Sequence, residues 1–185
     1  RGAYEAGVKV SAAYPGTPST EISENLVKYK DSLYCEWSPN EKVATEVAIG
    51  ASVSGVRAMS CMKHVGFNVA ADPTYTVSYM GVNGGLVIVV ADDPGLYSSQ
   101  NEQDTRMVAR AAQLPVIEPS DSAEAKEFIK IAFDLSEQFD RPFVYRTTTR
   151  LAHSQGLVEL SERKEIEDKP YEKNIRKNVM MPGNA

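Results

Sequence analysis

The run Leu86-Val87-Ile88-Val89-Val90-Ala91 is apolar at every position. A strand with one side in water alternates apolar and polar residues, whereas a parallel strand covered by helices on both faces is apolar throughout. We therefore place this run near the centre of a parallel sheet. Other short apolar runs predict further strands at Val8–Ala13, Ser32–Trp37, Val56–Cys61, Pro115–Glu118 and Pro142–Arg146.

Segments with helical patterns separate these strands, near Pro18–Lys30, Pro39–Ser54, Asn68–Val82, Glu102–Gln113 and Ser122–Phe139. This alternation predicts an α/β fold, a doubly wound, mostly parallel six-stranded sheet with helices on both faces. Asp72-Pro73 indicates that the third helical segment has two pieces, and Ser120 or Asp121 should begin the last one.

The length of 185 residues suits one such domain, because 42% hydrophobic residues can form a substantial core. We assign residues 1–160 to this domain. The stretch after it, residues 161–185, is rich in Lys and Glu and lacks apolar periodicity, which is typical of a charged linker or wrapping arm. The first residues read as the end of a helix, so we expect the chain to be a fragment of something longer.

Composition excludes several classes of protein. A formal net charge of -5 with no basic stripe argues against a nucleic-acid partner. No stretch is apolar enough to cross a membrane, so we expect a cytoplasmic protein. Cys35 and Cys61 show no CxxC spacing, which argues for core thiols and against a disulfide, zinc or iron–sulfur site. Asp92-Asp93 precedes Pro94-Gly95, and we interpret it as a turn and not as a metal site.

Unusual residues follow three of the predicted strands, where ligands collect in doubly wound sheets. The first group is Tyr14-Pro15-Gly16-Thr17-Pro18-Ser19, in which Thr17 is a candidate N-cap with Pro18 at the first helical position. Such a turn can hold a polar ring or a carboxylate through backbone N–H groups. From spacing alone, a capped helix start is the stronger interpretation.

The second group is Ser38-Pro39-Asn40-Glu41, which fits a capping box that pairs Ser38 with Glu41. At 100° per residue, Glu41 borders a stripe of small residues that includes Ala44 and Ala48, while Glu46 points toward water. A carboxylate in a mostly apolar site is a candidate acid or base, because burial disfavours its charged form. The capping role and the chemical role both remain open.

The third group, Lys63-His64-Val65-Gly66-Phe67-Asn68, is predicted to be a strand-to-helix loop. Gly66 would let the backbone approach a ligand closely, and His64 could move a proton near neutral pH. A lone histidine is more often a hydrogen-bonded core or surface residue, so His64 gains weight only from Gly66 and Asn68 beside it.

In these motifs the chain resembles the 2-oxoacid:ferredoxin oxidoreductases, and among them those that act on indolepyruvate. The resemblance covers most of the chain and also includes Ala48-Ile49-Gly50-Ala51 and Ser98-Ser99-Gln100-Asn101-Glu102-Gln103-Asp104. It implies a thiamine-diphosphate-binding fold, with residues 1–160 as the domain that binds the aminopyrimidine ring. Glu41 would bond a ring nitrogen and act catalytically with His64. The implied cofactor-binding residues are Tyr14, Pro15, Gly16, Thr17, Glu41, Gly66 and Asn68, with no metal ligand.

The resemblance also implies a reaction and partners. The full enzyme would decarboxylate an aryl 2-oxo acid oxidatively, passing electrons to ferredoxin and the acyl group to coenzyme A. Mg²⁺ and iron–sulfur clusters would lie in other parts of the protein, since the chain has no Gly-Asp-Gly motif for the diphosphate and no cluster ligands. We therefore expect a separate diphosphate-binding domain, a beta subunit, a homo-oligomer, and no activity from this chain alone.

Other interpretations remain. The same fold could serve a non-oxidative thiamine-dependent decarboxylase or an enzyme similar to acetolactate synthase, or a doubly wound binding domain without catalysis. A nicotinamide-binding domain is disfavoured, because Tyr-Pro-Gly-Thr-Pro follows the first strand in place of GxGxxG. In the pyruvate-using relatives an arginine contacts the substrate carboxylate from the segment that reads Ala91–Gly95 here, so that contact is open in this chain.

Overall fold

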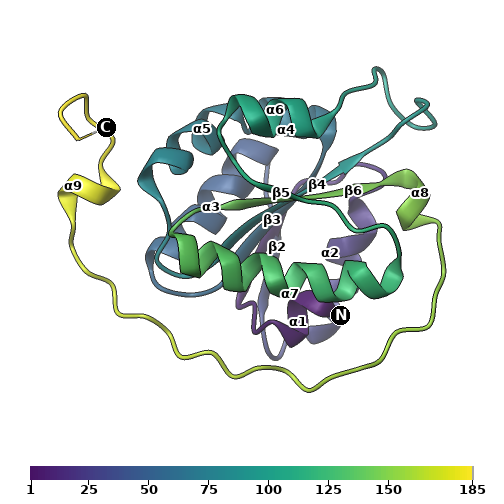
Figure 1. Cartoon of the computed structure of the whole chain (residues 1–185), viewed down its shortest axis with the longest axis horizontal. Coiled ribbons are helices and arrows are strands. Elements are labelled where there is room, and N and C mark those ends of the chain that lie inside the picture. The colour runs from purple at the N-terminus through teal and green to yellow at the C-terminus, as the bar shows by residue number, and fades with distance from the viewer. Residues whose placement is uncertain (185) are drawn as a thin grey trace.

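The fold is a parallel six-stranded sheet between two layers of helices, in a computed structural model that describes residues 1–184. The strand order is β2-β1-β3-β4-β6-β5, and every neighbouring pair is parallel. This confirms the predicted fold class (Figure 1). The strands are β1 Val10–Ala13, β2 Tyr34–Trp37, β3 Ala58–Lys63, β4 Leu86–Asp92, β5 Val116–Ile117 and β6 Phe143–Thr148.

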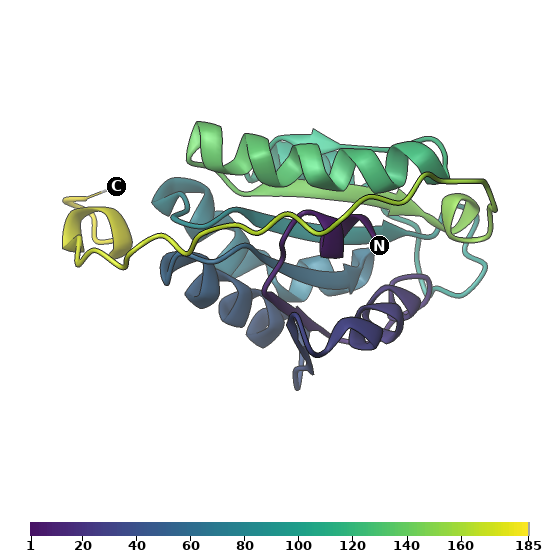
Figure 2. The same cartoon turned by 90° about the horizontal axis from the view of Figure 1, so that it is seen from below.

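Helices cover both faces of the sheet (Figures 1 and 2). One layer contains α1 (Gly2–Glu5), α2 (Thr20–Leu26) and α7 (Ser122–Phe139), and the other contains α3 (Glu41–Val53), α4 (His64–Val69), α5 (Ala71–Met80) and α6 (Thr105–Ala111). Shorter pieces are the 3-10 helix η1 (Val27–Tyr29), α8 (Thr149–Ala152) directly after β6, and α9 (Ile175–Asn178).

The central strand β4 is buried at every residue, as its unbroken apolar run predicts. Its side chains alternate between two cores. Val87 and Val89 pack with Ile129 and Phe133 of α7, whereas Ile88 and Val90 pack with residues of the opposite layer such as Phe67. A polar residue at any of these positions would face a core, which explains why the sequence signal is so clear.

Several boundaries differ from the predicted ones. Strand β3 runs to Lys63, two residues beyond the predicted end at Cys61, because Met62 and Lys63 pair with Val90 and Ala91 of β4. The third helical segment is divided in two as expected, but the break is at Ala70. Asp72 therefore lies inside α5 and forms no cap. Asp121 is the N-cap of α7, with its carboxylate accepting from Glu124 N, which confirms the predicted start.

Residues 154–174 form neither helix nor strand and run along the outside of the domain from α8 to α9 (Figures 1 and 2). We call this segment the arm. Two backbone N–H groups of the arm donate to the domain: Lys164 N to Glu5 O of α1 at 2.9 Å, and Lys169 N to Gly55 O at 3.0 Å. The Arg163 guanidinium donates to the carbonyls of Tyr4 and Val8. The arm is therefore attached to the domain at several points.

The two cysteines are free thiols, Cys61 buried and Cys35 half-buried. Burial raises the pKa of the Cys61 thiol to about 12, so it stays protonated and unreactive. Within residues 1–184, the structure contains no helix long and apolar enough to cross a bilayer.

Candidate functional site

The sheet has a topological switch point between β1 and β3. The chain leaves β1 toward β2 on one side and leaves β3 toward β4 on the other, although β1 and β3 are neighbours. In doubly wound sheets, ligands bind in the crevice that such a reversal opens at the carboxyl ends of the strands. The three groups of residues selected from the sequence follow β1, β2 and β3, and therefore lie along this edge.

Glu41 is the first residue of α3, which follows β2 after the short connection of residues 38–40, and it is 8% exposed. The small-residue stripe is confirmed, since Ala44 and Ala48 are fully buried while Glu46 is exposed. The predicted capping box is wrong. Asn40 caps α3 by accepting from Val43 N at 3.0 Å, so the Glu41 carboxylate is not used as a cap.

Ser38, the residue expected to cap α3, donates its hydroxyl to Glu36 at 2.7 Å. An asparagine two residues later caps equally well, and spacing alone could not choose between the two. This decides between the two interpretations of Glu41. Its carboxylate is buried at the ligand edge and does not cap the helix, which leaves the chemical role.

Gly66 packs directly against the side chain of Glu41. A Cβ atom at Gly66 would lie 2.5 Å from Glu41 Cγ and closer still to Oε1, which a real side chain cannot do. The glycine is therefore required by the position of Glu41, and the close contact joins the β2 and β3 strand ends. Gly66 was expected to make room for a ligand, whereas in the structure it makes room for the Glu41 side chain.

The turn after β1 is closed by its own hydrogen bonds. Gly16 N donates to Thr20 Oγ1 at 2.8 Å, and Ser19 Oγ donates to Gly16 O at 2.6 Å. The helix begins only at Thr20, so the prediction that Thr17 caps it with Pro18 as its first residue is wrong. Thr17, like Tyr14 and Pro15 before it, is exposed at the edge of the sheet.

His64 begins α4 immediately after β3, so the loop predicted at residues 63–68 is a helix start. The imidazole is 1% exposed. Its Nε2 lies 3.0 Å from Asn101 O, and its Nδ1 is buried without a hydrogen-bond partner among residues 1–184. Buried polar atoms are nearly always bonded, so the unpaired Nδ1 marks a place for a polar atom that the protein does not supply.

The segment 94–103 covers the β3 strand end, and we call it the covering loop. Three side chains from Lys63 to Asn68 hold it: Lys63 Nζ donates to Ser98 O, His64 bonds Asn101 O, and Asn68 Nδ2 donates to Gln103 Oε1 at 3.0 Å. Asn68 is therefore directed to the loop and not to the other predicted site residues. Lys63 was not among the predicted site residues, although a lysine at the end of a fully buried strand was the available signal.

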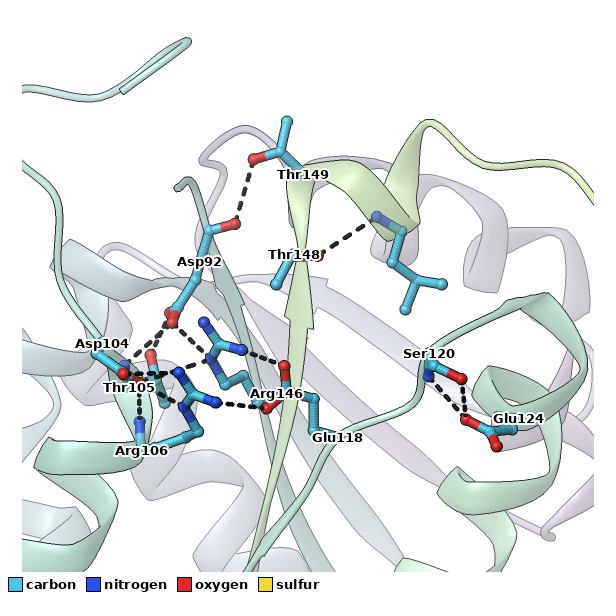
Figure 3. A network of polar contacts seen from close by, with 11 residues as sticks. Asp92, Asp104, Thr105, Arg106, Glu118, Ser120, Glu124, Arg146, Thr148 and Thr149 are labelled. Carbon is cyan, nitrogen blue, oxygen red and sulfur yellow. Dashed lines mark hydrogen bonds and ion pairs between the residues drawn. The ribbon is translucent and has the colours of Figure 1, made fainter. Parts of the chain in front are cut away.

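Asp92 and Asp93 anchor the neighbouring strand ends. Asp92 is fully buried at the end of β4 and pairs with Arg146 Nε of β6 at 2.7 Å, and Arg146 also pairs with Glu118 (Figure 3). No cluster of metal-binding side chains occurs within residues 1–184. The turn predicted from Asp93-Pro94-Gly95 is confirmed, since Leu96 N donates to Asp93 O at 3.1 Å, while Asp92 is the last residue of β4.

Asp93 holds the base of the covering loop. Its carboxylate accepts from Ser98 N at 2.7 Å, Ser99 Oγ at 2.6 Å and Thr149 Oγ1 at 2.7 Å. Burial would raise the pKa of this carboxyl, but these bonds, together with the charge of Lys63, lower it to about 2. Asp93 is thus a charged anchor at neutral pH.

The predicted site residues therefore lie along one edge of the sheet. Some are in close contact with each other or with Lys63, some are exposed, and two are bonded to the covering loop. Glu41 meets Gly66, and Gly16 lies against Lys63, where a Cβ at Gly16 would be 3.1 Å from Lys63 Cβ. Tyr14, Pro15 and Thr17 lie exposed beside them, while His64 and Asn68 are bonded to the covering loop.

A family described as "Pyruvate flavodoxin/ferredoxin oxidoreductase, thiamine diP-bdg" matches residues 1–184. The chain belongs to this family. It is also 52% identical over 193 residues to "Indolepyruvate oxidoreductase subunit IorA" of Archaeoglobus fulgidus, covering 100% of this chain and 31% of that protein. The protein of the same name from Pyrococcus abyssi is 57% identical over 164 residues, 88% of this chain and 25% of its own length. The chain thus spans less than a third of these curated relatives.

Among solved structures, the fold is similar to that of a 2-oxoglutarate:ferredoxin oxidoreductase from Magnetococcus marinus with 2-oxoglutarate, coenzyme A and succinyl-CoA bound. The TM-score is 0.74 at 18% sequence identity, covering 82% of this chain and 28% of that one. At this identity the likeness shows the fold alone.

The residues at the switch point fit the polar ring of thiamine diphosphate. Glu41 offers a buried carboxylate with no capping duty, and Gly66 is a glycine because that carboxylate occupies the space of a side chain. The buried, unpaired His64 Nδ1 lies at the end of the neighbouring strand.

Proposed function

We propose that this chain is the pyrimidine-binding module of an enzyme that oxidatively decarboxylates indolepyruvate or a similar aryl 2-oxo acid. The observation that carries the proposal is the Glu41 carboxylate, which is buried beside Gly66 at the topological switch point and free of helix capping. Family membership supports the cofactor, and the names of the relatives support the substrate class.

Glu41 is the residue that we assign to proton handling. Thiamine diphosphate, when bound, supplies an electron sink for decarboxylation of a 2-oxo acid. Glu41 Oε1 would hold a proton against a nitrogen of its aminopyrimidine ring, and burial keeps water from competing for that proton. Tyr14, Pro15, Gly16 and Thr17 would border the ring from the β1 side. His64 would take part once its ring is uncovered.

The remaining assignments concern the whole protein. Ferredoxin as electron acceptor, coenzyme A as acyl acceptor, a beta subunit, a domain for the Mg²⁺-bound diphosphate, and iron–sulfur clusters outside this chain belong to the same proposal. The names of the relatives and of the similar structure support ferredoxin, coenzyme A and a further subunit, because they describe an oxidoreductase subunit and a ferredoxin-linked enzyme with coenzyme A bound. The Mg²⁺-binding domain and the clusters rest on the family resemblance. Homo-oligomer formation and a cytoplasmic location stay predictions.

The test is an anaerobic assay of the full-length subunit expressed with its partner subunit. We expect reduction of ferredoxin that depends on indolepyruvate, coenzyme A and thiamine diphosphate together. Release of CO₂ from indolepyruvate without ferredoxin reduction would contradict the oxidative assignment and favour a non-oxidative decarboxylase. Absence of any dependence on thiamine diphosphate would contradict the proposal at its base.

A further inference from the structure

Lys63 is a buried cation without an anionic partner. Within the part of the chain that the structure describes, the buried Lys and Arg side chains are Arg57, Lys63, Lys126 and Arg146. Arg57 pairs with Asp134 at 2.7 Å, Lys126 with Glu5 at 2.8 Å, and Arg146 with Asp92 at 2.7 Å. Lys63, 7% exposed, forms no ion pair with any residue of 1–184. Burial of an unpaired charge is costly, so this departure from the pattern calls for a cause.

The hydrogen bonds of Lys63 are also incomplete. An ammonium group has three donors, and among residues 1–184 Lys63 Nζ has one acceptor, the carbonyl oxygen of Ser98 in the covering loop. The charge of Lys63 is felt by Asp93, but the Asp93 oxygens already accept from Ser98, Ser99 and Thr149. The ammonium therefore keeps donors free for a further acceptor.

The position of Lys63 is fixed and lies at the switch point. Its stem lies against Gly16 of the turn after β1, and three residues later Gly66 contacts Glu41. Only the covering loop separates the ammonium from solvent, since residues 94–98 of that loop are exposed. Lys63, His64 and Asn68 hold this loop by side-chain bonds to Ser98, Asn101 and Gln103, and no backbone bond joins it to the sheet within the described residues.

We propose that Lys63 is the residue that binds the carboxylate of the 2-oxo acid. The inference rests on the proposed function. The carboxylate takes the place of the Ser98 carbonyl, which holds the ammonium in the absence of substrate, and it supplies the negative charge that every other buried cation in the domain already has. The covering loop moves aside to admit it. Lys63 is then a specificity residue that selects acids over neutral ketones.

A purely structural role predicts different behaviour. If Lys63 only fastens the covering loop, its loss would loosen the loop and affect charged and neutral ligands alike. If it binds the substrate carboxylate, its loss would weaken charged ligands selectively. The discriminating quantity is thus the preference for a carboxylate over a neutral ligand of the same shape.

The experiment uses the full-length complex with Lys63→Met, which keeps the stem and removes the charge, and Lys63→Gln as a second charge-removing variant. Two inhibitors are compared, indolepropionate and its amide. We expect KM for indolepyruvate to rise about ten- to a hundredfold, as for loss of a hydrogen-bonded charge pair. We also expect the preference for indolepropionate over the amide to disappear. Lys63→Arg should restore much of both.

The matched control is Lys42→Met, the same change at an exposed lysine paired with Asp72, which should leave KM and inhibitor preference unchanged. Exchange of the coenzyme C2 proton needs no substrate and should persist in the Lys63 variants. An unaltered acid-over-amide preference in a folded Lys63 variant with active C2 exchange would overturn this inference and leave the proposed function intact. A wild-type complex that turns over no 2-oxo acid would instead overturn the proposed function.

Discussion

At the scale of single residues, helix α3 carries two carboxylates that differ in their surroundings. Glu41 is buried at the ligand edge, while the Glu46 side chain is 50% exposed and lies 3.9 Å from Lys42. An exposed pair of this kind contributes little to stability. The two positions therefore offer the same substitution in two environments.

Glu41→Gln in the full-length enzyme should lower turnover by roughly two to four orders of magnitude, because the amide cannot exchange a carboxyl proton with the ring nitrogen. Thermal stability should change little, since Asn40 and not Glu41 caps the helix. Glu46→Gln should leave both properties near wild type. The checks are C2-proton exchange and a melting curve. Normal exchange in Glu41→Gln would remove Glu41 from the mechanism.

Gly66→Ala tests whether the position of Glu41 matters. The added methyl group overlaps the Glu41 side chain and should displace it, reducing C2-proton exchange and turnover while costing about 1–3 kcal/mol in stability. Gly50→Ala is the control, because no atom outside its own helix neighbourhood lies within 4 Å of a Cβ there, and it should stabilise α3 by about 0.5–1 kcal/mol. Full activity in Gly66→Ala would show that the contact is unimportant.

Residue periodicity predicted the buried and exposed faces of α3 correctly, because helical spacing fixes directions within one helix. It could not predict the contact between Gly66 and Glu41, because those residues lie on different helices whose separation depends on the packing of the sheet. The unpartnered state of Lys63 was hidden for the same reason, since it depends on the path of a loop that begins some thirty residues later.

At the scale of elements, long periodic segments were predicted well and their ends less so. The all-apolar β4 and the amphipathic α7 occur where expected. Two of the errors fall where two good capping residues compete, as at Ser38 and Asn40, and where a strand continues into a helix without a loop, as at Lys63 and His64. In both cases the deciding interactions are made with other parts of the fold.

The covering loop should depend on Asp93. Asp93→Asn removes the negative charge to which three groups donate hydrogen bonds. We expect it to destabilise the base of the loop by about 1.5–3 kcal/mol. Faster hydrogen exchange over residues 94–103 would report this loss. Because the pKa of Asp93 is lowered to about 2 from 3.8, its contribution is complete above pH 3.8 and lost as pH falls toward 2. Asp72→Asn, at an exposed pair, is the control. Equal rates of hydrogen exchange over residues 94–103 in both variants would show that Asp93 does not anchor the covering loop.

At the scale of the whole molecule, a buried carboxylate joins the arm to the domain. Glu5 is 1% exposed and bonds Arg1 at 2.9 Å, Lys126 at 2.8 Å and the Ser161 backbone N–H at 2.9 Å. Burial would raise the pKa of Glu5, but the bonds to Lys126, Ser161 and Arg1 hold it well below the ordinary range. The sequence indicated a charged arm but not its path, because many of its contacts, such as Ser161 with Glu5 and Lys169 with Gly55, join residues far apart in the chain.

Glu5→Gln should destabilise the protein by about 3 kcal/mol, since it leaves Lys126 buried with a weakened partner. The free energy of unfolding of the wild type should also fall as pH drops below 4.5, the ordinary pKa of a glutamate. The pKa of Glu5 is lowered in the folded state, so its stabilising contribution is complete above pH 4.5 and is lost at lower pH. The variant should lose this part of the pH dependence. Denaturant unfolding at several pH values measures both.

The control is Glu127→Gln, which touches the same lysines but has a side chain that is 52% exposed, so the change should cost about 1 kcal/mol or less. A Glu5 variant as stable as this control would show that the buried cluster does not hold the arm.

The arm also constrains how this chain can change over evolutionary time. Gly55 has φ of +100°, and any Cβ there would run into the Lys169 backbone; Gly7, with φ of +77°, meets Ile166 and the Lys164 carbonyl in the same way. Each glycine is thus doubly determined, by its own backbone and by a segment far along the chain. Lineages that keep the arm should keep both glycines. In a lineage in which the arm follows another path, the contact with the arm would no longer prevent replacement, and only the positive φ would still favour glycine.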